Sequence, residues 1–278
     1  GPEEFRSQWM TFHKNSHKKL LKMGIGTMFI DSYSSRGQMA SSSADQFTVP
    51  LWSMFMDQFF ALEHLSKDSK VNIKKVGISG HSRGGMVSTL SSEKRLRDAL
   101  ISKDLYFAAA QPRAPDCENV SMFRNPQPIK ETKTWMVLGG ADDYTRAGPC
   151  VELGEKIKAN GGDIKIDVKK GWHHGFLGNY PAELSEDAQI FWKCPRLWTE
   201  DDGKYNKEYI DWMLKYGAYD SEEAMWEMVK NDPEKAYARS GIPYEKSNCM
   251  FLGAHTGGDK GRIFMKPFLK FWEENLLN

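Results

Sequence analysis

Two patterns of apolar and polar positions alternate along this chain. Apolar residues three and four positions apart predict helices, and short continuous apolar runs predict buried strands. The predicted helices are residues 4–23, 50–65, 151–160 and 262–276, with one more that follows residue 82 and reaches about residue 100. The predicted strands are residues 25–30, 76–79, 105–110, 134–139 and 164–168. Strands alternating with helices predict an α/β fold, a mostly parallel central sheet flanked by helices.

The pattern changes between residues 178 and 259. This stretch is rich in Trp, Tyr and charged residues and is interrupted by four prolines. Residues 209–216 and 221–230 within it have helical spacing. We interpret the stretch as a cap-like insertion in a single domain of residues 1–278. A serine-rich loop is expected at residues 32–43.

The composition narrows the class of protein. The chain has 278 residues, 40% of them hydrophobic and 27% charged, which suits one globular domain. A net charge of +1 points to no nucleic-acid partner, and no apolar run is long enough to predict a membrane span. The four cysteines have no C-x-x-C spacing, so no metal site is expected. Their even number fits either two disulfides, which form in an oxidising compartment such as the periplasm or outside the cell, or four buried thiols.

Candidate chemistry begins with a Gly-x-Ser-x-Gly motif, in which Gly80 and Gly84 flank Ser82. A strand-like run precedes the motif and a helix-like run follows it. Such an elbow exposes a serine hydroxyl above the end of a sheet, on a sharp turn that small residues permit. The motif therefore predicts that Ser82 is a nucleophile.

A serine hydroxyl needs a histidine to take its proton and a carboxylate to orient that histidine. In hydrolases with this elbow the acid and then the histidine follow the serine along the chain, each after a later strand. Asp142 and Asp143 follow one predicted strand, and His173 and His174 follow the next. The spacing alone leaves open which member of each pair serves.

Four segments resemble the dienelactone hydrolase family of α/β-hydrolases. They are Asp31–Gly37, the Ser82 elbow, Gly139–Thr145 and His174–Phe176. The resemblance implies an α/β-hydrolase fold with the cap-like insertion after the catalytic histidine, and it selects Asp142 and His174. The family's namesakes carry Cys where this chain has Ser82, so the serine-bearing esterase branch is implied.

The resemblance also implies substrate and oxyanion contacts. Arg36 matches a position near the pocket where an arginine can hold a substrate carboxylate, its alternative role being an ion pair. The backbone N–H of Arg83 is expected to donate to the oxyanion. His81 and Trp172 are expected beside the substrate, with His81 supporting the turn rather than reacting.

One family feature has no counterpart in the sequence. Family members begin with strands, and with an oxyanion loop, that are missing here. Without the missing strand, we expect a gap in the sheet between the strand that ends at Asp31 and the strand that leads to Ser82, and an incomplete chain or another segment that completes it. From their placement along the chain, Cys194 is expected to pair with Cys249, and Cys117 with Cys150.

The sequence thus predicts a serine hydrolase for an ester or lactone of a small to medium organic acid, with no cofactor. A peptidase or amidase would use the same three residues, and a non-catalytic binding protein would keep the fold. The expected partner is a small molecule, and the oligomeric state is open.

Overall fold

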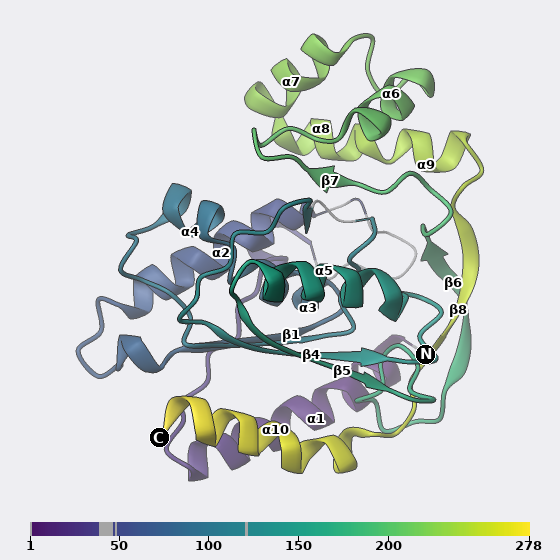
Figure 1. Ribbon diagram of the computed structural model, residues 1–278. Coiled ribbons are helices and arrows are strands. Elements are labelled where there is room, and N and C mark those ends of the chain that lie inside the picture. The colour runs from purple at the N-terminus through teal and green to yellow at the C-terminus, as the bar shows by residue number, and fades with distance from the viewer. Residues whose placement is uncertain (1, 39–46, 48, 120–121) are drawn as a thin grey trace.

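A four-stranded parallel sheet forms the centre of the protein (Figure 1). The computed structural model describes residues 2–38, 47, 49–119 and 122–278. The strands lie in the order β1-β2-β4-β5, and every neighbouring pair is parallel. Their bounds are β1 Gly77–His81, β2 Ala109–Arg113, β4 Lys133–Gly139 and β5 Asp163–Lys169. The expected mostly parallel sheet is confirmed.

Helices cover both faces of this sheet (Figure 1). One face carries α2 (Leu51–Leu65), α3 (Arg83–Leu90) and α5 (Ala147–Ala159), and the other carries α1 (Pro2–Lys22) and α10 (Gly261–Leu276). Two buried apolar clusters follow from this layering, one on each face of the sheet. The helices predicted at 4–23, 50–65, 151–160 and 262–276 are present, with ends displaced by a few residues. No described helix is both long enough and apolar enough to cross a lipid bilayer.

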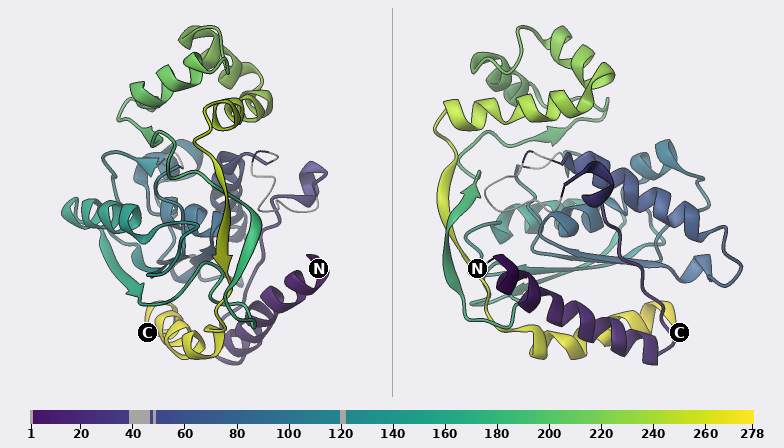
Figure 2. Two further views of the ribbon diagram at one scale, coloured as in Figure 1. Left: turned by 90° about the vertical axis from the view of Figure 1, so that its right-hand side faces the viewer. Right: turned by 180° about the vertical axis from the view of Figure 1, so that it is seen from behind.

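The insertion forms a cap of helices that lies away from the sheet (Figures 1 and 2). The antiparallel strands β6 (Glu183–Ile190) and β8 (Phe251–Thr256) run side by side between the cap and the rest of the domain. Its helices are α6 Lys207–Lys215, α7 Glu222–Asn231, α8 Pro233–Ser240 and α9 Ile242–Lys246. The two cap helices predicted from sequence correspond to α6 and α7, whereas β6, β8, α8 and α9 were not predicted.

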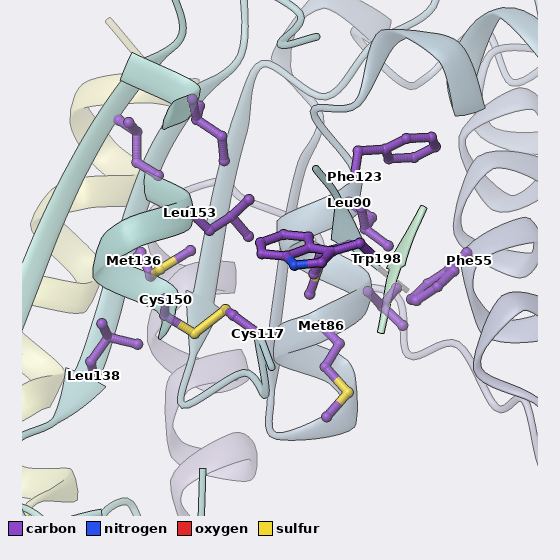
Figure 3. Close-up of a cluster of buried hydrophobic side chains, with 14 residues drawn as sticks. Phe55, Met86, Leu90, Cys117, Phe123, Met136, Leu138, Cys150, Leu153 and Trp198 are labelled. Carbon is purple, nitrogen blue, oxygen red and sulfur yellow. A yellow bond between two sulfur atoms is a disulfide. The ribbon is translucent and has the colours of Figure 1, made fainter. Parts of the chain in front are cut away.

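A strand pair joins the cap to the core, and a disulfide closes the base of the cap. The short strand β7 (Trp198–Thr199) pairs with β3 (Met122–Phe123), and the Trp198 ring packs into the core cluster (Figure 3). The disulfide Cys194–Cys249 joins the two ends of the cap. A second disulfide, Cys117–Cys150, lies inside the core cluster (Figure 3). Both expected pairings are confirmed.

Several local predictions were wrong. The run Ile25–Ile30 forms no strand, and its Met28, Phe29 and Ile30 side chains are exposed. The predicted strand 105–110 is displaced toward the C-terminus and becomes β2. The single helix expected to follow Ser82 is two helices, α3 and α4 (Lys94–Leu100), because Glu93 begins a new helix by capping the Arg95 N–H.

The expected gap within the sheet takes a different form. Among the described residues β1 is an edge strand, with β2 as its partner on one side. Residues 25–30 do not pair with it. They form no strand, since a strand needs a neighbour that shares its backbone hydrogen bonds. The first part of the serine-rich loop contains a 3-10 turn at Ser34–Arg36, and residues 39–43 of that loop lie outside the described residues.

Candidate active site

Ser82 lies on the sharp turn between β1 and α3. Its backbone has φ 54° and ψ −118°, a conformation that few residues other than glycine adopt. The Ser82 N–H donates to the Arg113 carbonyl at 2.9 Å, which holds the turn against β2. A Cβ at Gly80 would lie 2.1 Å from the Gly84 carbonyl oxygen, and one at Gly85 would lie 2.4 Å from the Arg113 carbonyl oxygen. The tight packing therefore needs glycine at 80 and 85, whereas the space at Gly84 is open.

The structure brings Ser82, His174 and Asp142 together although 92 residues separate the first from the second. His174 Nε2 lies 3.0 Å from Ser82 Oγ, and His174 Nδ1 lies 2.9 Å from Asp142 Oδ2. The carboxyl ends of parallel strands meet at one edge of a sheet, so the turns after β1, β4 and β5 converge there. With the proton on Nδ1, facing the carboxylate, Nε2 is free to accept the serine proton.

A set of hydrogen bonds fixes the Asp142 carboxylate. Its Oδ1 accepts the backbone N–H groups of Tyr144 at 3.0 Å and Thr145 at 2.8 Å. The buried Thr145 hydroxyl lies 3.1 Å from Asp142 Oδ2 and 3.1 Å from His174 Nδ1. Thr145 therefore touches both partners of the pair. The sequence analysis gave it no role, because a hydroxyl three residues after an aspartate is ordinary turn chemistry.

Two other rings lie close to the His174 ring. The His81 ring is 4.8 Å away, and the Tyr144 ring is 4.8 Å away. Desolvation, and then the nearby His174 and Arg113, holds the pKa of His81 well below its usual range. A neutral His81 can accept the Gly175 N–H, which lies 3.3 Å from its Nε2. His81 thus contacts the loop that carries His174.

Arg113 is a second residue that the sequence analysis missed. It ends β2, is almost completely buried, and its Nε donates to the Gly80 carbonyl at 3.3 Å. Burial lowers the pKa of Arg113 to about 9. Its guanidinium also lies 5.8 Å from the Phe12 ring and 5.7 Å from the Phe268 ring. The buried Arg113 side chain therefore supports the serine turn through its hydrogen bond to Gly80.

The other predicted contacts lie farther out. Arg36 forms a two-pronged ion pair with Asp57, at 2.8 and 3.0 Å, so it has the alternative role expected for it. Binding of a substrate carboxylate by Arg36 stays a prediction. Trp172 packs against Phe176 in the cluster under α10, with the ring centres 4.9 Å apart. Arg83 begins α3, and its side chain donates to the Val49 carbonyl.

A cavity of about 470 Å³ lies between α2 and α3 and the cap. Arg83, the residue after Ser82, contributes to its lining, whereas Ser82, Asp142 and His174 do not, and most of its wall is aromatic or aliphatic. From the core side it is lined by Leu51, Trp52, Phe55 and Met86, and from the cap side by Tyr209, Met213, Tyr219, Met225, Val229 and Tyr237. Burial raises the pKa of Tyr237, which Arg83 opposes by a hydrogen bond and its charge. The cavity therefore lies between α2, α3 and the cap, next to the residue that follows Ser82.

The remaining members of the two candidate pairs lie apart from Ser82. Asp143 accepts the backbone N–H of His255 at 2.9 Å, and its Oδ2 lies 2.7 Å from His255 Nδ1. The His173 ring lies 5.4 Å from the His255 ring. These three side chains form the group of metal-ligating atoms found among the described residues.

Comparison with known proteins gives a family and partial relatives. The sequence model of the dienelactone hydrolase family matches residues 10–193. "Protein usf" of Aquifex pyrophilus is 26% identical over 121 residues, which are 43% of this chain and 48% of that protein. The chain therefore spans about half the length of the curated relative that it matches.

Among solved structures, similarity is low. MGS-M1, an α/β hydrolase enzyme from a Medee basin deep-sea metagenome library, is 18% identical with a TM-score of 0.36, over 50% of this chain and 56% of that chain. The thermophilic esterase Est2 of Thermogutta terrifontis is 15% identical with a TM-score of 0.36, over 49% of this chain and 57% of that chain.

Proposed function

Because the chain belongs to the dienelactone hydrolase family and has the α/β-hydrolase fold, we propose that it is a serine hydrolase of carboxylic esters. One observation carries this proposal. A continuous hydrogen-bonded line runs from Ser82 Oγ through the His174 ring to Asp142, with links of 3.0 and 2.9 Å. It starts from a serine held at positive φ on a strand-to-helix turn.

In the proposed mechanism, Ser82 Oγ attacks the ester carbonyl carbon while His174 Nε2 takes the hydroxyl proton. His174 then donates this proton to the departing alkoxide, which leaves as the alcohol, and an acyl-serine ester remains. Water then attacks the acyl carbonyl carbon while His174 accepts a water proton, and His174 gives this proton to Ser82 Oγ as the acyl–oxygen bond breaks and the acid leaves. Asp142 orients the imidazole and stabilises its cationic form.

The tetrahedral intermediate needs donors for its oxyanion. The first N–H groups of a helix have no partner within the helix, and they carry the positive end of its dipole. Arg83 is the first residue of α3, so its N–H is our candidate donor. Removal of one such donor costs about 10²–10³-fold in kcat in related chemistry. A second donor stays a prediction.

The size and the apolar wall of the cavity support a more specific proposal for the ester substrate. Its volume of about 470 Å³ is within the range of small-molecule sites, and its wall is mostly apolar. We infer that it holds the apolar part of a medium-sized ester, with the carbonyl at Ser82. The two disulfides support an oxidising compartment for the protein.

The test is a panel of nitrophenyl esters from acetate to octanoate, assayed beside aminoacyl nitroanilides. We expect ester turnover that Ser82→Ala reduces by up to roughly 10⁶-fold in kcat. Ser79→Ala is the matched control, because Ser79 lies on β1, the strand that leads to Ser82, and its hydroxyl contacts Gln111 rather than His174. Faster turnover of the amides would favour a peptidase, and no turnover of either set by folded protein would favour a binding protein.

A further inference from the structure

Each half of the proposed His–Asp pair has a neighbour in sequence that points elsewhere. Asp142 and His174 contact each other and lead to Ser82, whereas Asp143 and His173 lie beside His255 of β8. Adjacent residues in extended or turn backbone direct their side chains apart. The same two loops therefore hold two separate Asp–His groups, and the proposed hydrolase chemistry uses one of them.

The second group has the composition and the spacing of a metal site. One carboxylate oxygen of Asp143 and one ring nitrogen each from His173 and His255 all lie within 4.8 Å of one another. Asp143 already contacts β8, since its Oδ1 accepts the His255 backbone N–H at 2.9 Å. Two imidazoles and one carboxylate are ligands that zinc and its first-row neighbours prefer.

One ring nitrogen of His173, Nδ1, is buried without a hydrogen-bond partner among the described residues. A buried ring nitrogen without a partner costs free energy unless a proton donor or a cation satisfies it. A cation bound to the three side chains through this nitrogen of His173 would satisfy it.

We propose that Asp143, His173 and His255 bind a divalent first-row transition-metal ion, for which zinc is the best match. Zinc binds nitrogen and oxygen ligands at about 2.0–2.2 Å, so its ligands lie roughly 3.3 Å apart in a tetrahedron. The widest separation here, up to 4.8 Å, would have to shorten by roughly 1.5 Å. Rotation of the Asp143 and His255 side chains, which are 44% and 47% exposed, supplies this movement. Their exposure also leaves a position for a water ligand.

Such an ion joins three distant segments. Asp143 follows β4, His173 follows β5 and His255 belongs to β8. The ion therefore ties the two loops that carry Asp142 and His174 to the strand that leads from the cap. We assign it a supporting role rather than a place in the ester reaction, because Asp142 and His174 turn away from it toward Ser82.

The test measures metal binding directly and so does not depend on the hydrolase proposal. Metal-free protein is titrated with zinc chloride in a calorimeter, and with cobalt chloride while the visible d–d absorption of four-coordinate cobalt is recorded. We expect saturation at one equivalent and a higher Tm with zinc. His255→Gln and His173→Gln should each weaken binding by at least about tenfold, the loss typical even of a supporting residue.

His64→Gln is the matched control, because His64 is an exposed histidine near the end of α2 and should leave binding unchanged. Each variant is compared with its own metal-free form, so a change in basal stability is not mistaken for lost binding. The His255 side chain is exposed, which makes its variant the one expected to fold normally. No saturable binding, or equal affinity in His255→Gln, His173→Gln and His64→Gln, would overturn the proposal.

Discussion

The sheet region and the cap are built in different ways. All five residues of β2 are buried, as are six of the seven in β4, as expected for parallel strands covered on both faces. In the cap, α6 buries four residues in a small cluster, whereas α7 and α8 each bury one, Met225 and Ala236, and both of these also line the cavity. All three proposed catalytic side chains come from the sheet region. On the proposed function, the bond chemistry belongs to the sheet region, whereas the cap supplies one wall of the cavity, so cap mutations should change substrate fit and leave the chemistry intact.

The largest expected effect concerns the sheet region alone. Asp142→Asn would present an amide to His174 Nδ1 and favour the wrong tautomer of the ring. We expect kcat for a short ester to fall by about 10⁴-fold with little change in KM. Asp167→Asn is the control, since Asp167 lies on β5 and pairs with Lys169. Steady-state kinetics checks this, and a kcat of Asp142→Asn within tenfold of the wild type would remove Asp142 from the mechanism.

The next largest effects, on Tm and on ester kinetics, are expected from removing either disulfide. Cys194–Cys249 closes 55 residues at the base of the cap, and Cys117–Cys150 closes 33 residues within the core cluster. Loop-closure entropy assigns each about 4 kcal/mol. Cys194→Ser/Cys249→Ser should lower Tm and raise KM for octanoate esters, while kcat for acetate stays near the wild-type value.

Cys117→Ser/Cys150→Ser should lower Tm to a similar degree, and should also lower kcat for acetate, because this disulfide packs in the core cluster with residues of α3, which follows Ser82, and β4, which leads to Asp142 (Figure 3). Thermal unfolding and ester kinetics on both double variants give the comparison. Equal losses of acetate turnover in the two variants would contradict the separation of cap and sheet region.

A smaller effect is expected from filling the cavity. Val229 of α7 lines it from the cap side. Val229→Trp should reduce kcat/KM for octanoate relative to acetate by about tenfold, within the range for altered apolar fit in a pocket. Glu227→Trp, on the exposed side of the same helix, should leave the ratio unchanged. An unchanged ratio in both variants would mean that the acyl chain does not enter this cavity.

The smallest effect is on the pH dependence of stability. Burial, with the charge of Arg113, lowers the pKa of His13 in α1 to about 3. Between this value and the unfolded value of about 6.5, the unfolded chain binds a proton that the folded chain does not. The free energy of unfolding should therefore fall as pH falls through this window, by up to about 1.4 kcal/mol per pH unit from His13.

His13→Gln should remove that part of the slope in urea unfolding between pH 6.5 and 4.5, whereas His64→Gln should keep it. Tyr219 of the cap acts at high pH, because burial raises its pKa to about 12. The free energy of unfolding should therefore fall as pH rises above the unfolded value of about 10. A slope equal to the wild type's in His13→Gln would show that the histidine is not buried in its neutral form.

The sequence predicted the parts whose signals are local. The glycines around Ser82, and the acid and histidine that follow later strands, are short-range patterns, and sheet topology brings them to one edge. The run Ile25–Ile30 has the composition of a strand but finds no neighbour to pair with, so it lies exposed. Strand β6 was missed for the opposite reason, since its sequence is mostly charged and polar and only Ala188 and Ile190 are buried.

Other features depend on contacts between distant segments. The cavity forms only when α2 and α3 meet the cap, and no single stretch of sequence encodes its wall. The group of Asp143, His173 and His255 joins three segments, so no local motif such as a cysteine spacing indicates it. Thr145 and Arg113 acquire their contacts with the site in the same way, through the fold.

The central claim is that His174 and Asp142 make the Ser82 hydroxyl reactive. A fluorophosphonate probe tests this directly, because it forms a covalent bond with an activated serine. Wild-type protein should gain one equivalent of probe, mapped by peptide mass spectrometry to Ser82, and Ser82→Ala should gain none. Folded wild-type protein that stays unlabelled, or that carries the label on another serine, would contradict the account.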